Sequence, residues 1–399
     1  MKKLKKVSLM NNRQNPKCKM QKVWTLLFTF GFLLFTFLPV FAQESLKSSN
    51  KSDLPQETAG PVLPSQIGQV QTVETFGDEK LSPTGELNQV KQSVEIKVLT
   101  GAHKGEKVII DNMLMGNPAY DIKLKTGDKV ILHVEQNAGG GVDFFIADKL
   151  RVNVLYFLAG LFFALLLIIG QKKGLFSLIS ILVTLGLIFW ALTPLILSGM
   201  NPILATVLIC VFASIIAIYL VGGINPKSTA AILGTVLSLA IAGILSVSSI
   251  KFAGLTGFSS EESMFLFTAH PTLNFVGILA SAMIIGALGA VMDIGMSISS
   301  TVNELFSSNE QMCVRELFTS GMNVGKDIIG TMANTLILAY LGGALSLVLL
   351  SSNIDMQKFF NLNQVATEIS SALIGSIAIV LCVPITAIIS AYLIRRGKK

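Results

Sequence analysis

Two carboxylates and one amide stand at or inside apolar stretches of this chain, where residues facing lipid are rarely polar. Asp293 ends one apolar run, Asp327 begins the next, and Asn334 lies deeper in the second. Ionisable residues in membrane segments pair with one another, face water, or mark an ion pathway. Carboxylates at matching depths on packed helices could share a proton or a cation. The open alternative is interfacial, with Asp327 at a helix N-terminus and Asp293 paired with Lys326.

A small and polar face runs along the second of these apolar runs. Four-residue steps on an α-helix stay on one face, and here they fall on Asp327, Thr331, Thr335, Ala339 and Gly343, with Asn334 one position away. Such a face is costly against acyl chains, so it must meet another helix or an aqueous path. The candidate path residues are Asp293, Asp327, Thr331, Asn334 and Thr335, although Asn334 could instead be structural glue between helices.

Small residues also recur on the run that ends at Asp293. Ala282, Gly286 and Ala290 lie four residues apart, and Gly289 belongs to a second such line. Small side chains at this spacing let two helix backbones approach closely in lipid. We therefore expect helix packing at these four positions and at Gly330.

Seven apolar segments fill residues 150–396, each near the roughly 20 residues that a bilayer crossing needs. They are 152–170, 175–197, 203–221, 228–250, 271–292, 328–350 and 370–394. Lys and Arg fall almost wholly on alternate sides of these segments, which predicts a cytoplasmic C-terminus and an extracytoplasmic segment 43–150. The expected fold is an all-α polytopic bundle of seven core helices in the lipid bilayer of the bacterial cytoplasmic membrane, with no prediction of the oligomeric state.

The N-terminal segment 1–42 adds a cationic leader and a further apolar run, 23–40. The small residue Ala42 after this run resembles a signal-peptidase site, whereas about 18 apolar residues also suit an anchor helix. Both alternatives stay open, so the mature chain has seven or eight spans.

Between the leader and the bundle, the sequence predicts a linker and a small domain. Residues 43–90 are rich in Ser, Gln, Pro, Thr and Glu, which is typical of a flexible linker. Strand-like alternation then appears within residues 91–143, over 94–98, 108–110, 120–124 and 130–134. We expect a small extracytoplasmic β-barrel or β-sandwich, tethered to the membrane by residues 137–141.

The segment 293–326 is predicted to be a cytoplasmic loop with two short amphipathic helices, over 298–306 and 312–319, the second ended by Gly321. Such a loop could be a gate, a docking site for a cytoplasmic partner, or simply interfacial packing.

Several classes of function are disfavoured. The formal net charge is +7, but cytoplasmic tails beside membrane spans supply it, so a nucleic-acid partner is not expected. No phosphate-binding loop or catalytic Ser/His/Asp pattern is present, and the four cysteines have no zinc-ligand spacing. We expect no enzyme activity, no cofactor and no metal site.

Three stretches, 98–108, 286–299 and 316–335, resemble the YibE/F family of bacterial multi-pass membrane proteins. The resemblance runs from about residue 94 to the C-terminus and leaves the segment 43–90 outside. It implies a multi-pass topology and presumed transport, without functional residues to carry over. Lys326 stands where an Arg would be expected before Asp327, which keeps the charge but weakens bidentate anion pairing.

Two functions follow from these observations. The first is a permease or exporter of an ion or small solute, with a polar path between the spans 271–292 and 328–350. The alternative is a non-transporting cell-envelope sensor or scaffold with an extracytoplasmic binding domain. The deep polar face favours the permease, because a scaffold does not require it.

Overall fold

A computed structural model describes residues 63–76, 90–117, 121–136 and 141–396. The chain divides into two compact units, which meet in sequence between Leu165 and Leu166, and each unit is described by itself. The N-terminal leader, residues 43–62 and 77–89 of the predicted linker, and residues 137–140 of the predicted tether lie outside the described residues.

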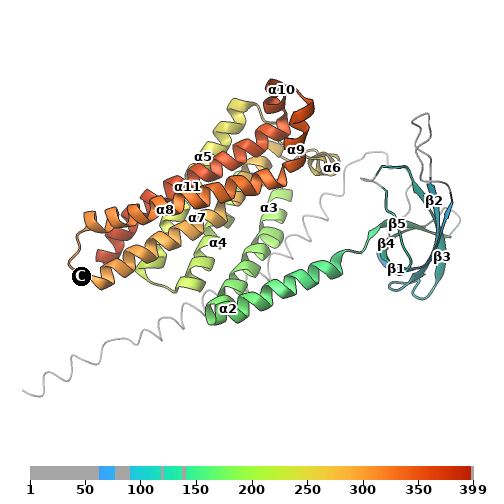
Figure 1. Cartoon of the computed structure of the whole chain (residues 1–399), viewed down its shortest axis with the longest axis horizontal. Helices are drawn as coiled ribbons and strands as arrows, with labels where there is room; N and C mark the ends of the chain where they lie inside the picture. The colour runs from blue at the N-terminus through green and yellow to red at the C-terminus, as the bar shows by residue number, and fades with distance from the viewer. Residues whose placement is uncertain (1–62, 77–89, 118–120, 137–140, 397–399) are drawn as a thin grey trace, which may run out of the picture. The chain divides into compact units, whose positions relative to one another are not determined.

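Five strands form one antiparallel sheet in the order β3-β2-β1-β4-β5 (Figure 1). Their bounds are β1 Leu63–Phe76, β2 Val90–Val98, β3 Lys107–Leu114, β4 Lys129–Gln136 and β5 Val142–Lys149. The end strands β3 and β5 also approach each other, so the sheet is barrel-like and nearly closed. Its core consists of Val70, Val94, Ile96, Val98, Leu124, Val130 and Leu132. The expectation of a small barrel-like β domain is confirmed.

The prediction of a flexible linker over 43–90 is wrong for residues 63–76. These residues form β1, the central strand, which pairs with both β2 and β4. The inward face of β1 carries Gln66 and Gly68 where apolar residues would reveal a strand. A Cβ on Gly68 would clash with Ile96 and would lie 2.9 Å from Leu132, so glycine is needed for these side chains to close the core.

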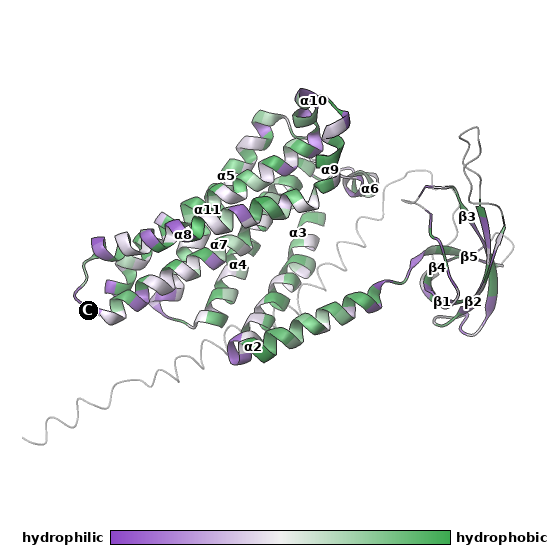
Figure 2. Ribbon diagram, viewed as in Figure 1, coloured by the Kyte–Doolittle hydropathy of each residue, from purple (hydrophilic) through white to green (hydrophobic). Residues whose placement is uncertain are grey.

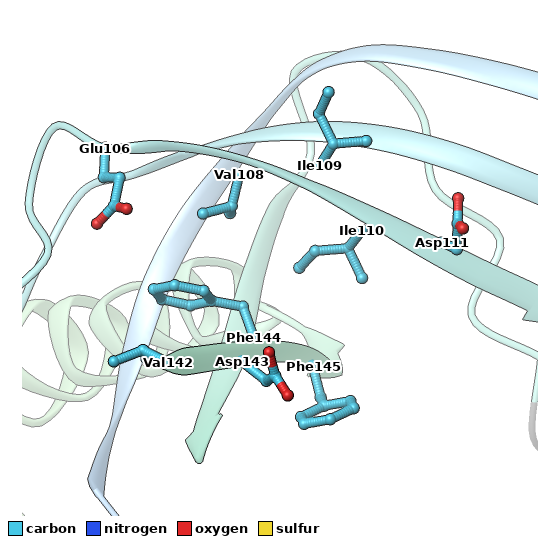
Figure 3. Close-up of a pocket in the computed structure, with 9 residues that line it drawn as sticks. All are labelled: Glu106, Val108, Ile109, Ile110, Asp111, Val142, Asp143, Phe144 and Phe145. Atoms are coloured by element: carbon cyan, nitrogen blue, oxygen red, sulfur yellow. The ribbon is translucent and has the colours of Figure 1, made fainter. Parts of the chain in front are cut away.

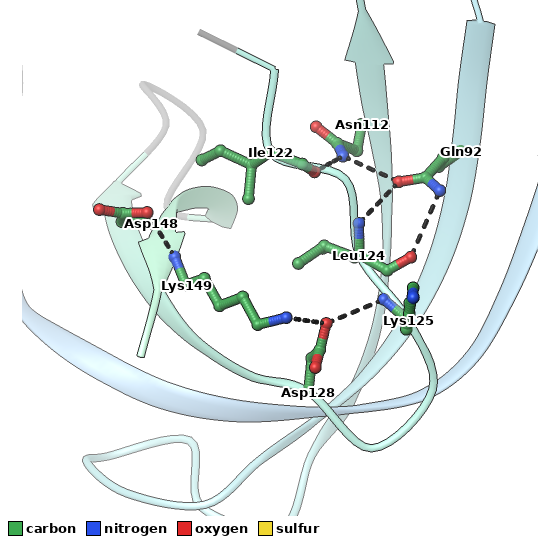
Figure 4. A network of polar contacts seen from close by, with 8 residues as sticks. All are labelled: Gln92, Asn112, Ile122, Leu124, Lys125, Asp128, Asp148 and Lys149. Carbon is green, nitrogen blue, oxygen red and sulfur yellow. Dashed lines mark hydrogen bonds and ion pairs between the residues drawn. The ribbon is translucent and has the colours of Figure 1, made fainter. Parts of the chain in front are cut away.

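The expected strand over 120–124 is absent from residues 121–124, which follow an irregular path. Leu124 is nevertheless buried, because Gln92 takes the place of a neighbouring strand. The Leu124 backbone N–H donates to Gln92 Oε1 (3.1 Å), and Gln92 Nε2 donates to the Leu124 carbonyl (3.4 Å) (Figure 4). Asn112 Nδ2 donates to the Ile122 carbonyl at 2.8 Å. Side-chain amides thus satisfy backbone groups that a ladder would otherwise pair.

Asp128 closes the turn that follows this segment. Its carboxylate accepts hydrogen bonds from Lys149 Nζ (2.6 Å) and from the Lys125 backbone N–H (3.0 Å) (Figure 4). Burial raises the pKa of the Asp128 carboxyl, but these hydrogen bonds and the charges of both lysines outweigh burial and hold the pKa below its usual value. Because Lys149 belongs to β5, the β domain extends to residue 149, beyond the predicted end at 143.

From Val152 onward the chain is helical, and the boundary between the two units lies within the first helix, α2. The helices are α2 Val152–Leu187, η1 Ile188–Leu192, α3 Thr193–Leu197, α4 Pro202–Gly222, α5 Pro226–Ala253, α6 Glu261–Ala269, α7 Phe275–Ser308, α8 Val314–Gly343, α9 Leu345–Leu350, η2 Ser351–Asn353, α10 Met356–Asn361 and α11 Asn363–Arg396. Figure 2 shows the long helices coloured mainly as hydrophobic residues. Helices α5, α7 and α11 pack against one another, with α8 on α11 and α7, and α4 on α5 and α7.

By length and apolarity, five of the described helices can cross a membrane, or six if the bent pair of α8 with α9 and η2 is one span. The count is below the expected seven because residues 152–197 form one helical element of 46 residues. Within it, Gln171 departs from helical geometry, with φ 47° and ψ −127°. A Cβ on Gly174 would clash with the carbonyl oxygen of Leu166, so the backbone folds back on itself at this point.

The two helices predicted within the loop 293–326 are present, but they are parts of the long helices α7 and α8, so the prediction of a separate loop with a helix end at Gly321 is wrong. Helix α7 continues to Ser308, and α8 starts at Val314 and passes through Gly321 without a break. The apolar positions read as two amphipathic loop helices, among them Ile298, Val302 and Leu317, are buried in the bundle core. Glycine at 321 serves packing, because a Cβ there would lie 2.9 Å from Val302.

The predicted straight span 328–350 is also bent. Helix α8 ends at Gly343, and the following α9 and η2 turn away from it by 69°. Ala344 has φ −98° and ψ 18° at this break, beside the glycine pair that ends α8.

Candidate functional site

Helix α8 carries four of the five candidate path residues, and its own packing decides where they face. On its buried side, Gly325 lies against α11 and α7. A Cβ on Gly325 would clash with Val383 and would lie 3.2 Å from Ile298. Ile328 and Met332 continue this side as partly buried residues against the core.

The polar residues occupy the other side of α8. Asp327, Thr331, Asn334 and Thr335 are all exposed on the bundle surface. The two threonine hydroxyls donate to their own helix, Thr331 to the Ile328 carbonyl (3.0 Å) and Thr335 to the Thr331 carbonyl (2.8 Å). Asn334 makes no hydrogen bond within the described part of the chain, and Leu338, 54 % exposed, shares its side of the helix.

Asp293 is exposed on α7. Among the described residues, no hydrogen bond or ion pair joins Asp293 to Asp327, and neither carboxylate is paired with Lys326. The structure therefore contains neither the direct carboxylate pair nor the interfacial ion pair that the sequence left open.

The small residues of α7 divide into two groups. Gly286 contacts α8, because a Cβ there would clash with the hydroxyl of Tyr340. Gly289 on α7 and Gly330 on α8 border open space, since no atom lies within 4 Å of a Cβ at either position. Ala282 is exposed and Ala290 is partly buried against the core.

One acidic residue of the bundle was missed by the sequence reasoning. Glu368 lies on α11, half-buried and within electrostatic range of Tyr340. A single carboxylate at the start of the last apolar segment was a signal that could have drawn attention to it. Tyr340 therefore lies close both to Gly286 of α7 and to Glu368 of α11.

A second polar set lies in the centre of the bundle. Thr235 of α5 and Ser390 of α11 are both fully buried, and their hydroxyl oxygens have no partner within the described residues. A glycine makes room for Thr235, because a Cβ on Gly295 would lie 2.8 Å from Thr235 Oγ1.

The chemistry available in these sites is coordination and hydrogen bonding. Hydroxyls, one amide and separate carboxylates can solvate a cation or a small polar solute, or relay a proton. Across the described ranges, no group of three His, Cys, Asp or Glu residues is placed to hold a metal ion.

Comparison with protein families separates the β domain from the helical region. The model described as YibE/F-like protein matches residues 158–396, and the YibE/F family N-terminal domain matches residues 64–149. The second match begins at the start of β1, so the segment thought to lie outside the resemblance belongs to it in part. No curated protein and no solved structure matches the chain. Since these family models cover the β domain and nearly all of the helical region, the chain belongs to the YibE/F family of multi-span membrane proteins.

Proposed function

We propose that this protein is a permease or exporter of an ion or small solute. The observation that carries the proposal is the exposed polar side of α8, where Asp327, Thr331 and Asn334 face away from the bundle core. A carboxylate and an unpaired amide are costly against acyl chains. A water-lined path along this side of α8 removes that cost and gives the residues a role.

The proposed path passes between α7 and the polar side of α8. The open space at Gly289 and Gly330 supports this location, because larger residues would fill it. Asp293 and Asp327 each lie near the middle of their helices, α7 and α8, and each supplies a carboxylate to a passing cation or proton. The proposal includes no enzymatic reaction and no cofactor.

We also propose seven core spans and a fixed orientation. At a rise of about 1.5 Å per residue, 46 helical residues are roughly twice as long as a bilayer core is thick, so the reversal at Gln171 divides α2 to α3 into two spans. Lys172, Lys173, Lys227 and Arg396 then share the cytoplasmic side. The β domain lies outside the bacterial cytoplasmic membrane.

The second candidate function is a non-transporting sensor or scaffold of the cell envelope. It is favoured by the β domain, which exposes large apolar side chains at Ile109 (75 %) and Phe145 (48 %). Contiguous exposed apolar side chains commonly mark binding surfaces. In this case the polar side of α8 would bind another membrane helix.

The deciding experiment compares sealed vesicles with and without the protein. Both are loaded with a cell extract, an ion gradient is imposed, and the ions and metabolites retained inside are measured. The permease should change the retention of at least one solute, and Asp327→Asn should abolish that change while the protein still inserts. Glu304→Gln, an exposed acid elsewhere on α7, is the matched control and should keep full flux.

Sidedness is read from cysteines placed at Lys104 and at Asn309. An impermeant thiol reagent should label the first and not the second in intact cells, and the reverse pattern would overturn the orientation. If retention is identical with and without the protein for every solute and gradient, the permease is excluded and the scaffold is favoured. Full flux in both Asp327→Asn and Asp293→Asn would remove the acids from the path.

A further inference from the structure

The barrel-like sheet has an open seam between its two end strands. Within the described residues, β3 pairs only with β2 and β5 only with β4. A groove of about 440 Å³ lies between β3 and β5 (Figure 3). It is lined by Glu106, Val108, Ile109, Ile110, Asp111, Val142, Asp143, Phe144 and Phe145.

The inner wall of the seam is apolar. Val108, Ile110 and Phe144 point into the space between the strands (Figure 3) and pack against the domain core from its edge. On the outer side, Ile109 and Phe145 are exposed. A strand placed in the seam would therefore find apolar surface for side chains on both of its faces.

Each edge strand carries one lysine at its end, Lys107 on β3 and Lys149 on β5, but neither lysine lines the groove. Exposed edges in soluble proteins are blunted by lysines, by prolines or by covering elements, because unpaired backbone groups recruit further strands. The groove lining contains no Lys, Arg or Pro. Among the described residues, no strand pairs with the outer edge of β3 or of β5.

The seam carries negative charge, which favours segments with positive charge. Three carboxylates, Glu106, Asp111 and Asp143, line the groove without a lining cation. Glu106 contacts His103 (3.0 Å) and Asp111 contacts Lys91 (2.8 Å), whereas Asp143 has no ion-pair partner among the described residues. An occupant with cationic side chains complements this surface.

We propose that the seam between β3 and β5 binds an extended, Lys- or Arg-bearing peptide segment of another protein by strand addition. The backbone of the segment pairs with a free sheet edge. Its inward apolar side chains cover Val108, Ile110 and Phe144, and its cations lie beside Asp143 and Asp111. This inference is separate from transport, because it concerns the β domain alone.

The test uses the full chain in lipid nanodiscs and fluorescent peptides of eight residues, the length of β3. One peptide alternates Lys and Val, a second alternates Glu and Val, and a third is the first with N-methyl groups on alternate amides. Fluorescence anisotropy should detect binding of the Lys peptide. The Glu peptide should bind more than about tenfold more weakly, because like charges across an interface are strongly unfavourable. N-methylation should abolish binding, because it removes the strand hydrogen bonds without changing charge.

Variants locate the site. Asp143→Lys should weaken binding of the Lys peptide by more than about tenfold, and Asp143→Asn should give a smaller loss. Glu74→Lys, an exposed acid on β1 outside the groove, should leave binding unchanged. Asp143 is exposed, so unchanged thermal unfolding of both Asp143 variants verifies that the domain is intact.

Three outcomes would overturn the proposal. Equal binding of the Lys and Glu peptides would exclude charge selection, and full binding of the N-methylated peptide would exclude strand addition. Concentration-dependent dimerisation that Asp143→Lys prevents, without any peptide binding, would assign the seam to a second copy of the chain.

Discussion

The β domain and the helical bundle treat their polar residues differently. In the β domain, Gln92 and Asn112 are fastened to the backbone of residues 122–124. In the bundle, the hydroxyls of Thr235 and Ser390 are buried and have no hydrogen-bond partner in the described part of the chain, and Asn334 is exposed on α8. Since a fold normally satisfies the polar groups it buries, polar residues that it leaves unused are the better candidates for function.

The largest loss of stability is expected at Gln92, where the β domain uses a side chain in place of a neighbouring strand. Gln92→Leu leaves both the N–H and the carbonyl of Leu124 without partners, and each unsatisfied buried group costs about 1 to 3 kcal/mol. Amide hydrogen exchange in β2 and β4 should accelerate strongly. Protection equal to that of the unaltered protein would show that Gln92 is dispensable and would weaken the contrast between the two regions.

A smaller loss of stability is expected on substitution of Asp128, and its size should depend on pH. Its pKa is lowered in the folded state, so its stabilisation is present above the pKa of about 3.9 of an unfolded Asp and is lost as pH falls through the folded pKa. Asp128→Asn should lower the stability of the β domain by about 1.5 kcal/mol at neutral pH.

The measurement is thermal unfolding of the Asp128→Asn variant between neutral and acidic pH. The difference from the unaltered protein should shrink as pH falls, because protonation removes the same charge. A difference that is constant with pH would assign the effect to packing rather than to the ion pair with Lys149.

The smallest effect on stability is expected in the bundle core. Thr235→Val replaces an unpartnered hydroxyl with a methyl group of similar size, so the bundle should be unchanged or gain up to about 1 kcal/mol in thermal unfolding. Loss of solute flux in a variant of unchanged stability would sharpen the comparison, since the hydroxyl would then serve transport. A loss of stability would show that Thr235 has a structural partner.

Much of this architecture follows from the sequence because burial produces regular patterns. The alternation at Val94, Ile96 and Val98 correctly predicts β2, and the apolar segments correctly predict a multi-span protein. Strand β1 was not predicted, because two of its inward positions are Gln66 and Gly68, which fit the core by shape rather than by hydrophobicity. The alternation around Leu124 predicted a strand that is absent. Side-chain amides can hold an apolar residue in the core without the hydrogen bonds of a neighbouring strand.

In the helical region, too, the sequence predicts the local structure but not the packing partner. Ile298 and Val302 have the period of an amphipathic helix, but the pattern does not reveal whether the covered face meets a bilayer surface or another helix. The structure places both in the bundle core. The candidate residues on α8 were found because polar residues are rare in apolar segments, whereas their outward direction depends on tertiary packing around Gly325.

The attachment of Leu124 by a single glutamine also gives the β domain a point of local mobility. Opening any paired strand requires a series of ladder hydrogen bonds to break together, whereas residues 121–124 are held by the side-chain hydrogen bonds of Gln92, Asn112 and Asp121 and by the burial of Leu124. Segments with few backbone pairs open at a lower free energy than the domain unfolds. We therefore expect residues 121–124 to exchange their amide hydrogens faster than the five strands do.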